Sequence, residues 1–199
     1  EEMIWMAFFN NLHEIGKSNV LDGHISNPAF EQFYRDHIRK LIHVRGGQRY
    51  VSKANYLVTR MEYLLSIFPD ARFVLPVRDP VWHIASLIKQ HKLFCAGEAD
   101  NPRAIAHMQR VGHYEFGLDR RPINTGDLHE TFAIMKLWTN GDEIEGWARY
   151  WSNLHHYLAD RMIVNKDLAK ATLVVRYEDL VADPAKQLAS LFDHVELND

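Results

Sequence analysis

The sequence predicts an α/β domain in which a mainly parallel sheet is flanked by helices. Two short apolar segments, residues 72–77 and 172–177, have the composition of strands, and helical periodicity surrounds them. Strands that alternate with helices in this way are typical of a parallel sheet. The 199 residues are enough for one domain with a substantial core, and no repeat divides them, so we expect a single domain over residues 1–199.

The overall composition argues against several classes of protein and kinds of site. The net charge of −3 argues against a general nucleic-acid-binding surface. No apolar run reaches the roughly 20 residues that span a membrane. Cys95 is the single cysteine, which excludes an internal disulfide and favours a reducing compartment such as the cytoplasm. Histidines are numerous, but no H-E-x-x-H motif occurs among them, and we expect no metal site.

The first 70 residues predict three helices and one short strand. Residues 3–15 are rich in apolar side chains, and the helix over 28–44 ends at a pair of glycines. Residues 49–53 have the composition of a short strand, and a helix follows over 55–67. The apolar positions of the second helix share one face, which contains Phe30, Phe33, Tyr34, Ile38, Leu41 and Ile42.

Residues 72–93 predict a strand that leads directly into a capped helix. Pro76 lies within this strand, and because proline cannot donate to a ladder we expect an irregular strand end. Asp79 suits a helix cap, and Pro80 suits the first helical position. The helix is expected to run to about residue 93.

The second half of the chain begins with its least regular part. Residues 95–143 contain five glycines and two prolines, and we expect only short helices there, near 101–114 and 128–138. We interpret 95–143 as an irregular insertion or as a lid on the acceptor side. A clearer helix over 145–162 precedes the second strand, and its tryptophans are expected in the core. Asp183 and Pro184 open a last helix.

The end of the first apolar strand predicts an anion site. Ligands of parallel α/β sheets bind at the carboxyl ends of the strands, and Arg78 follows this strand directly. A helix begins beside it and offers free amide groups, while the guanidinium can bind a phosphate through two hydrogen bonds. Ser86 adds a hydroxyl donor from the same helix. The alternative is that Arg78 pairs with Asp79 or another acid while Ser86 only packs, because most helix starts bind no ligand.

Residues 68–86 carry a recognisable pattern: F-P-D-A-R-F, a short strand, R-D-P, and a serine eight residues after the arginine. The pattern resembles the 3′-phosphate-binding segment of sulfotransferases that use 3′-phosphoadenosine 5′-phosphosulfate (PAPS). Residues 49–60 resemble the family's W-x-x-K-x-P…R-L segment, and residues 174–184 resemble its R-Y-E-D-L-v-x-D-P segment. Together the resemblance covers residues 49–93 and 172–195, and it points to the bacterial-type and tyrosylprotein-type branches.

The resemblance implies a P-loop-type sulfotransferase fold, with PAPS as co-substrate and no metal. In the family, Arg78 and Ser86 correspond to residues that hold the 3′-phosphate, and Tyr177 corresponds to a residue near the adenine. Lys53 is the candidate cation for the reacting group, although it could be a solvated strand-end lysine. Glu2 is the candidate base, because some relatives place a catalytic glutamate in this region.

Several alternatives stay open for these residues. Glu1, His13 and His24 are further candidates for the base. Glu1 and Glu2 also suit a solvated helix start, where acids favour the dipole. Tyr177 could instead be a buried core tyrosine.

The sequence also departs from the family. No segment resembles the phosphate loop G-x-x-R-S-G-T-T, so the resemblance implies that the chain begins downstream of the first strand and of that loop. Asn55 replaces a proline of the family, which affects the geometry expected at Lys53. A sheet without its first strand exposes an edge, and this favours a homo-oligomer.

Two functions from different classes follow. The first is transfer of a sulfuryl group from PAPS to a hydroxyl or amine of a small molecule, a carbohydrate or a protein. The alternative is a catalytically inactive nucleotide-binding or interaction module derived from that fold, which the missing phosphate loop favours if these 199 residues are the natural length of the protein. A kinase of related architecture is disfavoured, because no G-x-x-x-x-G-K-[ST] motif is present.

Overall fold

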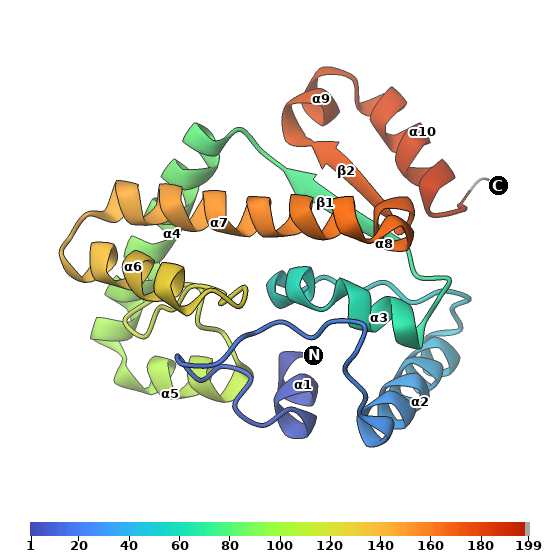
Figure 1. Ribbon diagram of the computed structural model, residues 1–199, viewed down its shortest axis with the longest axis horizontal. Coiled ribbons are helices and arrows are strands. Elements are labelled where there is room, and N and C mark those ends of the chain that lie inside the picture. Colours follow the sequence, from blue (N-terminus) through green and yellow to red (C-terminus); the bar gives the residue numbers. More distant parts are fainter. Residues whose placement is uncertain (198–199) are drawn as a thin grey trace.

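The structure, a computed structural model, describes residues 1–197, so the last two residues of the expected domain lie outside the described part. Figure 1 shows a mixed α/β arrangement in which helices dominate and surround a small parallel sheet, and this confirms the predicted fold class. The sheet of the described residues has two strands, β1 (Phe73–Val77) and β2 (Thr172–Arg176). They pair in parallel, with Phe73 opposite Thr172 and Val77 opposite Arg176.

The helices fall into two groups along the chain. Before β1 the chain forms α1 (Glu2–Phe8), α2 (Pro28–Arg45), the 3₁₀ helix η1 (Asn55–Thr59) and α3 (Met61–Ile67). After β1 it forms α4 (Pro80–Asp100), α5 (Pro102–Val111), α6 (Leu128–Thr139), α7 (Glu143–Val164), α8 (Lys166–Ala171), α9 (Tyr177–Ala182) and α10 (Pro184–His194).

The long helix α7 organises the molecule. In Figure 1 it crosses the middle of the fold, with β1, β2, α9 and α10 above its right half and α1, α2 and α3 below. It contacts α4, α6 and α8. None of the described helices combines the length and the apolar character needed to cross a membrane.

Apolar side chains gather in three clusters. The first joins α1, α2 and α3 around Trp5 and Phe30. The second packs α3, α7 and α8 against Phe73 of β1. The third lies between α4, α6 and α7 and contains Trp138 and Trp147. Trp147 is therefore in the core, as predicted for the tryptophans of this helix.

The start of α4 follows the prediction closely. Pro80 is its first residue, and the Asp79 carboxylate accepts hydrogen bonds from the amides of Val81 and Trp82, at 2.9 and 3.5 Å. Asp183 caps α10 in the same way, by accepting from the amide of Lys186. These caps satisfy amide groups that the first turn of a helix leaves unpaired.

Pro76 lies inside β1 rather than at an irregular strand end, so that expectation was wrong. The position is tolerated because β2 is the single neighbour of β1 among the described residues, and proline is accepted on edge strands.

The expected strand over residues 49–53 is absent from the described structure, which has an irregular segment there. A strand needs a neighbour to complete its ladder, and the two described strands pair only with each other.

Two predicted helices are shorter than expected. The helix over 55–67 is interrupted at Arg60, because the Thr59 carbonyl accepts from the amide of Leu21 instead of continuing an α-helical ladder. The helix over 3–15 ends at Phe8, whose carbonyl accepts from the side chain of Asn27.

Helical structure also extends further than predicted elsewhere. Helix α4 continues to Asp100, and the short helices α8 and α9 flank β2. Helices α5 and α6 are the two short helices expected within residues 95–143. Residues 112–127 between them are irregular.

Candidate functional site

The carboxyl ends of β1 and β2 bring Arg78 and Tyr177 together. Because Val77 and Arg176 are opposite each other in the register, the next residue of each strand leaves the sheet at the same edge. The Cζ atom of Arg78 lies over the ring of Tyr177, 5.0 Å from its centroid. The amide of Asp79 donates to Oε1 of Glu178 at 2.9 Å, which joins the two segments a second time. Two of the three predicted nucleotide-binding residues are therefore neighbours.

The guanidinium of Arg78 has no ion pair and no hydrogen bond within residues 1–197, so its described contact is the Tyr177 ring. The expected alternative was a pair with Asp79, but that carboxylate caps α4 instead. Hydrogen bonding from the Asp79 amide, helped by the nearby arginine charges, lowers the pKa of the exposed Glu178 carboxyl. Arg78 thus presents unused donors beside the start of a long helix, which is an arrangement that suits an anion.

Ser86 lies on α4, is exposed to solvent, and has a hydroxyl without a hydrogen bond in the described part of the chain. The arginine, the cap and the serine belong to one continuous unit that runs from the end of β1 into α4. Tyr177 is 48% exposed, so the alternative of a buried core tyrosine does not hold.

Lys53 is exposed in the irregular segment before η1. Its Nζ donates to Oδ1 of Asn55 at 2.9 Å, and Nδ2 of Asn55 donates to Oε1 of Glu115 at 2.9 Å. Asn55, the residue that departs from the family pattern, therefore ties Lys53 to the 112–127 segment. Among the described residues, neither a hydrogen bond nor an ion pair joins Lys53 to Arg78.

Glu2 is buried, with a relative exposure of 6%. Its two carboxylate oxygens accept from Arg60 at 2.9 and 2.6 Å, and Oε1 also lies 2.6 Å from Nε2 of His13. Burial alone would raise the pKa of this carboxyl, but the hydrogen bonds and charges of His13 and Arg60 outweigh it and hold the pKa below its ordinary value. A solvated helix start, one of the expectations for Glu2, is therefore wrong.

Glu1, the preceding residue, is exposed, and its side chain contacts other residues than Glu2 does. Its Oε2 accepts from the hydroxyl of Ser52 at 2.6 Å and from that of Tyr34 at 3.3 Å. Ser52 precedes Lys53 directly, so Glu1 is the candidate base on the Lys53 segment. The other candidate, His24, is exposed, and its amide donates to Asp22.

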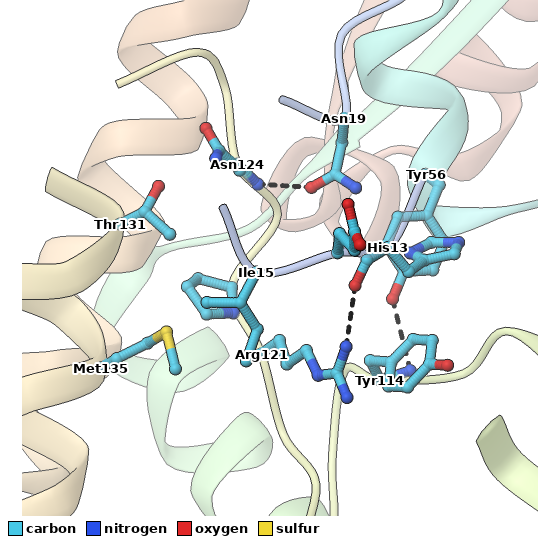
Figure 2. Close-up of a pocket in the computed structure, with 11 residues that line it drawn as sticks. His13, Ile15, Asn19, Tyr56, Tyr114, Arg121, Asn124, Thr131 and Met135 are labelled. Atoms are coloured by element: carbon cyan, nitrogen blue, oxygen red, sulfur yellow. Dashed lines mark hydrogen bonds between the residues drawn. The ribbon is translucent and has the colours of Figure 1, made fainter. Parts of the chain in front are cut away.

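Sequence reasoning missed the small cavity drawn in Figure 2. Its volume is about 20 Å³, which is room for roughly one water molecule and not for an acceptor. Across it, Arg121 donates to the carbonyl of His13 at 2.7 Å, and the Asn124 amide donates to Asn19 at 2.6 Å. Segments from both halves of the chain contact each other here, and no local sequence pattern predicts such a long-range contact.

Sequence reasoning also missed His83, which lies between Arg78 and Ser86 in the chain. Nε1 of Trp151 on α7 donates to Nδ1 of His83 at 3.1 Å. The signal that could have found His83 is its position three residues before Ser86, which puts both on one helical face. Among the described residues, no group of three or more His, Cys, Asp or Glu side chains is placed to hold a metal.

Comparison with known proteins is consistent with this geometry. A family model described as "Sulfotransferase family" matches residues 14–130, more than half of the chain, and this range contains Lys53, Arg78 and Ser86. The chain is 28% identical over 142 residues to the omega-hydroxy-beta-dihydromenaquinone-9 sulfotransferases Stf3 of Mycobacterium bovis and Mycobacterium tuberculosis. That match covers 70% of this chain and 26% of each relative, so the chain spans about a quarter of their length. No solved structure matches it. The extent of the family match shows that the chain belongs to the sulfotransferase family.

Proposed function

We propose that this chain is the part of a sulfotransferase that binds the 3′-phosphoadenosine end of PAPS. The observation that carries the proposal is the unpaired Arg78 guanidinium over the exposed Tyr177 ring, at the carboxyl edge of the sheet. A phosphate is bound well by the two-pronged guanidinium, and the start of α4 adds a favourable dipole. Ser86 supplies a hydroxyl donor, and the Tyr177 ring offers an aromatic surface to adenine.

The reaction we propose is an in-line transfer of SO₃. The acceptor oxygen or nitrogen attacks sulfur, the bond from sulfur to the bridging phosphate oxygen breaks, and 3′-phosphoadenosine 5′-phosphate leaves. By analogy with phosphoryl transfer, the protein mainly positions the groups and stabilises charge. Lys53 is the proposed cation for the charge that develops on the bridging oxygen.

A base must take the acceptor proton, and Glu2 remains a proposal for it. Both oxygens of Glu2 already accept hydrogen bonds from Arg60, so Glu2 can act only when this pair opens. Glu1 is accessible and hydrogen bonds to Ser52, next to Lys53, which supports it as the second candidate.

We propose a hydroxyl as the acceptor group. The name of the mycobacterial relatives specifies an omega-hydroxy-beta-dihydromenaquinone. For this chain, the proposed carriers of the hydroxyl are a small molecule, a carbohydrate or a protein. Residues 95–143 are the proposed acceptor-side lid. The support for this is Glu115, which accepts from Asn55 and so holds the segment against the Lys53 loop.

The alternative function is a nucleotide-binding or interaction module without catalysis. The outer edges of β1 and β2 have no neighbour in the described part, which supports self-association of the chain. Size-exclusion chromatography with light scattering measures this directly, and a monomer at all concentrations would contradict self-association.

Calorimetric titration with 3′-phosphoadenosine 5′-phosphate tests the nucleotide site. We expect binding by the wild-type chain and its loss in Arg78→Ala. Arg39→Ala is the matched control, because Arg39 is an exposed arginine on α2 that pairs with Asp36. Lack of binding by the folded wild-type chain, or equal loss in the two variants, would contradict the proposal. To separate the two functions, PAPS and a hydroxyl acceptor are supplied to the chain: binding without transfer favours the non-catalytic module.

A further inference from the structure

His83 is the fourth residue of α4, at the end of its first turn. It is half-buried, whereas Ser86 is exposed. Residues three apart lie on the same side of a helix, so His83 and Ser86 are neighbours on α4. Arg78 stands just before this helix at the end of β1.

The hydrogen bond from Trp151 determines which nitrogen of His83 carries the proton. An indole N–H can only donate, so Nδ1 of His83 must accept, and the proton of the neutral ring is on Nε2. Within residues 1–197, Nε2 forms no hydrogen bond. Burial, then the neighbouring His155 and the charge of Arg78, lower the pKa of His83, so the ring stays neutral near pH 7.

Trp151 is itself held in position on α7. Its ring stacks on His155 with centroids 3.7 Å apart, and Nδ1 of His155 lies 2.7 Å from the Trp151 carbonyl oxygen. The donor that orients His83 is therefore fixed by a second aromatic contact. Trp151 was expected only to pack in the core, but its indole N–H also donates a hydrogen bond at the edge of the candidate site.

We propose that His83 is a third donor to the 3′-phosphate, through its Nε2–H, beside the Arg78 guanidinium and the Ser86 hydroxyl. The inference rests on the proposed nucleotide site and adds a residue that neither the motif nor the family comparison assigns. A phosphate monoester has three terminal oxygens that accept strong hydrogen bonds, and the three side chains supply one cation and two neutral donors for them. Trp151 is a positioning residue in this arrangement, because it selects the donor nitrogen without contact with the ligand.

The test compares two nucleotides that differ only in the 3′-phosphate, 3′-phosphoadenosine 5′-phosphate and adenosine 5′-phosphate. His83→Phe keeps a ring but has no hydrogen-bond donor. We expect it to bind 3′-phosphoadenosine 5′-phosphate (the bisphosphate) about tenfold more weakly, because it loses one hydrogen bond to a charged group. Binding of adenosine 5′-phosphate should not change. His83→Gln, which restores an N–H donor, should recover part of the loss, and Trp151→Phe should cause a smaller loss for the bisphosphate alone.

His156→Phe is the matched control, since His156 is exposed on α7 and its hydrogen bonds within residues 1–197 are with Ser152. Circular dichroism tests whether each variant is folded. If His83→Phe does not fold, the affinities of His83→Gln and of wild type for the two nucleotides are compared instead. An equal loss for both nucleotides, or no loss, would overturn the role of His83 while Arg78→Ala still removes bisphosphate binding. Failure of the folded wild type to bind the bisphosphate would overturn the nucleotide site and His83 together.

Discussion

Arg60 and Glu2, 58 positions apart in the chain, form a two-point ion pair in the interior. Arg60 is fully buried, and its guanidinium also lies over the ring of Trp5, 4.6 Å from the centroid. His13 completes the environment of the Glu2 carboxylate. This group of side chains connects α1 to the start of α3, the last helix before β1.

Removal of Arg60 should strongly destabilise the fold. Arg60→Ala leaves the Glu2 carboxylate buried without its main partner, and breaking one side of a buried pair costs about 3–5 kcal/mol. Urea denaturation followed by circular dichroism measures this change in the free energy of unfolding. Arg39→Ala, at the exposed pair with Asp36, is the control and should change it by less than about 1 kcal/mol. Similar decreases in the free energy of unfolding for the two variants would show that the buried pair stabilises the fold no more than the exposed pair does.

Glu2 should also make stability depend on acid pH. Its pKa is lower in the folded chain than the ordinary value of 4.5, so the unfolded chain binds the proton more readily. The resulting stabilisation is fully present above about pH 4.5 and is lost as the pH falls through the folded-state value. Glu2→Gln should therefore show a smaller decrease in stability between neutral pH and pH 3 than wild type. Parallel curves of unfolding free energy against pH would contradict this.

Features of the fold that depend on neighbouring residues could be predicted from the sequence, whereas most features that depend on long-range contacts could not. The turn from β1 into α4 was predictable, because Asp79 and Pro80 act within a few residues of each other. The contact of Arg78 with Tyr177 follows from a general rule for parallel sheets, because residues just past the carboxyl ends of neighbouring strands leave the sheet at the same edge. The pairing of Arg60 with Glu2 has no such rule, since it depends on how α1 packs against α3.

The errors have the same origin. Residues 49–53 have strand composition, but without a neighbouring strand this propensity produces no ladder. The helix expected over 55–67 is interrupted where the Thr59 carbonyl meets the amide of Leu21, a contact from a distant loop. Trp151 lies at helical spacing with core residues, and only the structure shows its hydrogen bond to His83. In each case the presence or absence of a tertiary partner, and not the local preference, decides the outcome.

Gly146 should resist substitution because α7 packs tightly on α6 there. A Cβ atom at Gly146 would lie 2.4 Å from Cδ1 of Trp138, which is closer than carbon atoms can approach. Gly146→Ala should destabilise the chain by about 1–3 kcal/mol through overpacking, despite the better helix propensity of alanine. Gly97 on α4 is the matched helical control, because no atom of residues 1–197 lies within 4 Å of its added Cβ. Gly97→Ala should raise the melting temperature and Gly146→Ala should lower it; the same sign for both would contradict the packing argument.

Tyr177 should contribute to nucleotide affinity through its ring rather than its hydroxyl. The ring is half-exposed and lies under the Arg78 guanidinium, so it can both orient the arginine and present a face to adenine. Tyr177→Phe should keep the affinity for 3′-phosphoadenosine 5′-phosphate, whereas Tyr177→Ala should weaken it by about tenfold or more, as for loss of a base-stacking aromatic. Calorimetric titration of both variants measures the difference, with thermal melting to confirm folding. If the phenylalanine variant loses as much affinity as the alanine variant, the hydroxyl and not the ring is the recognition group.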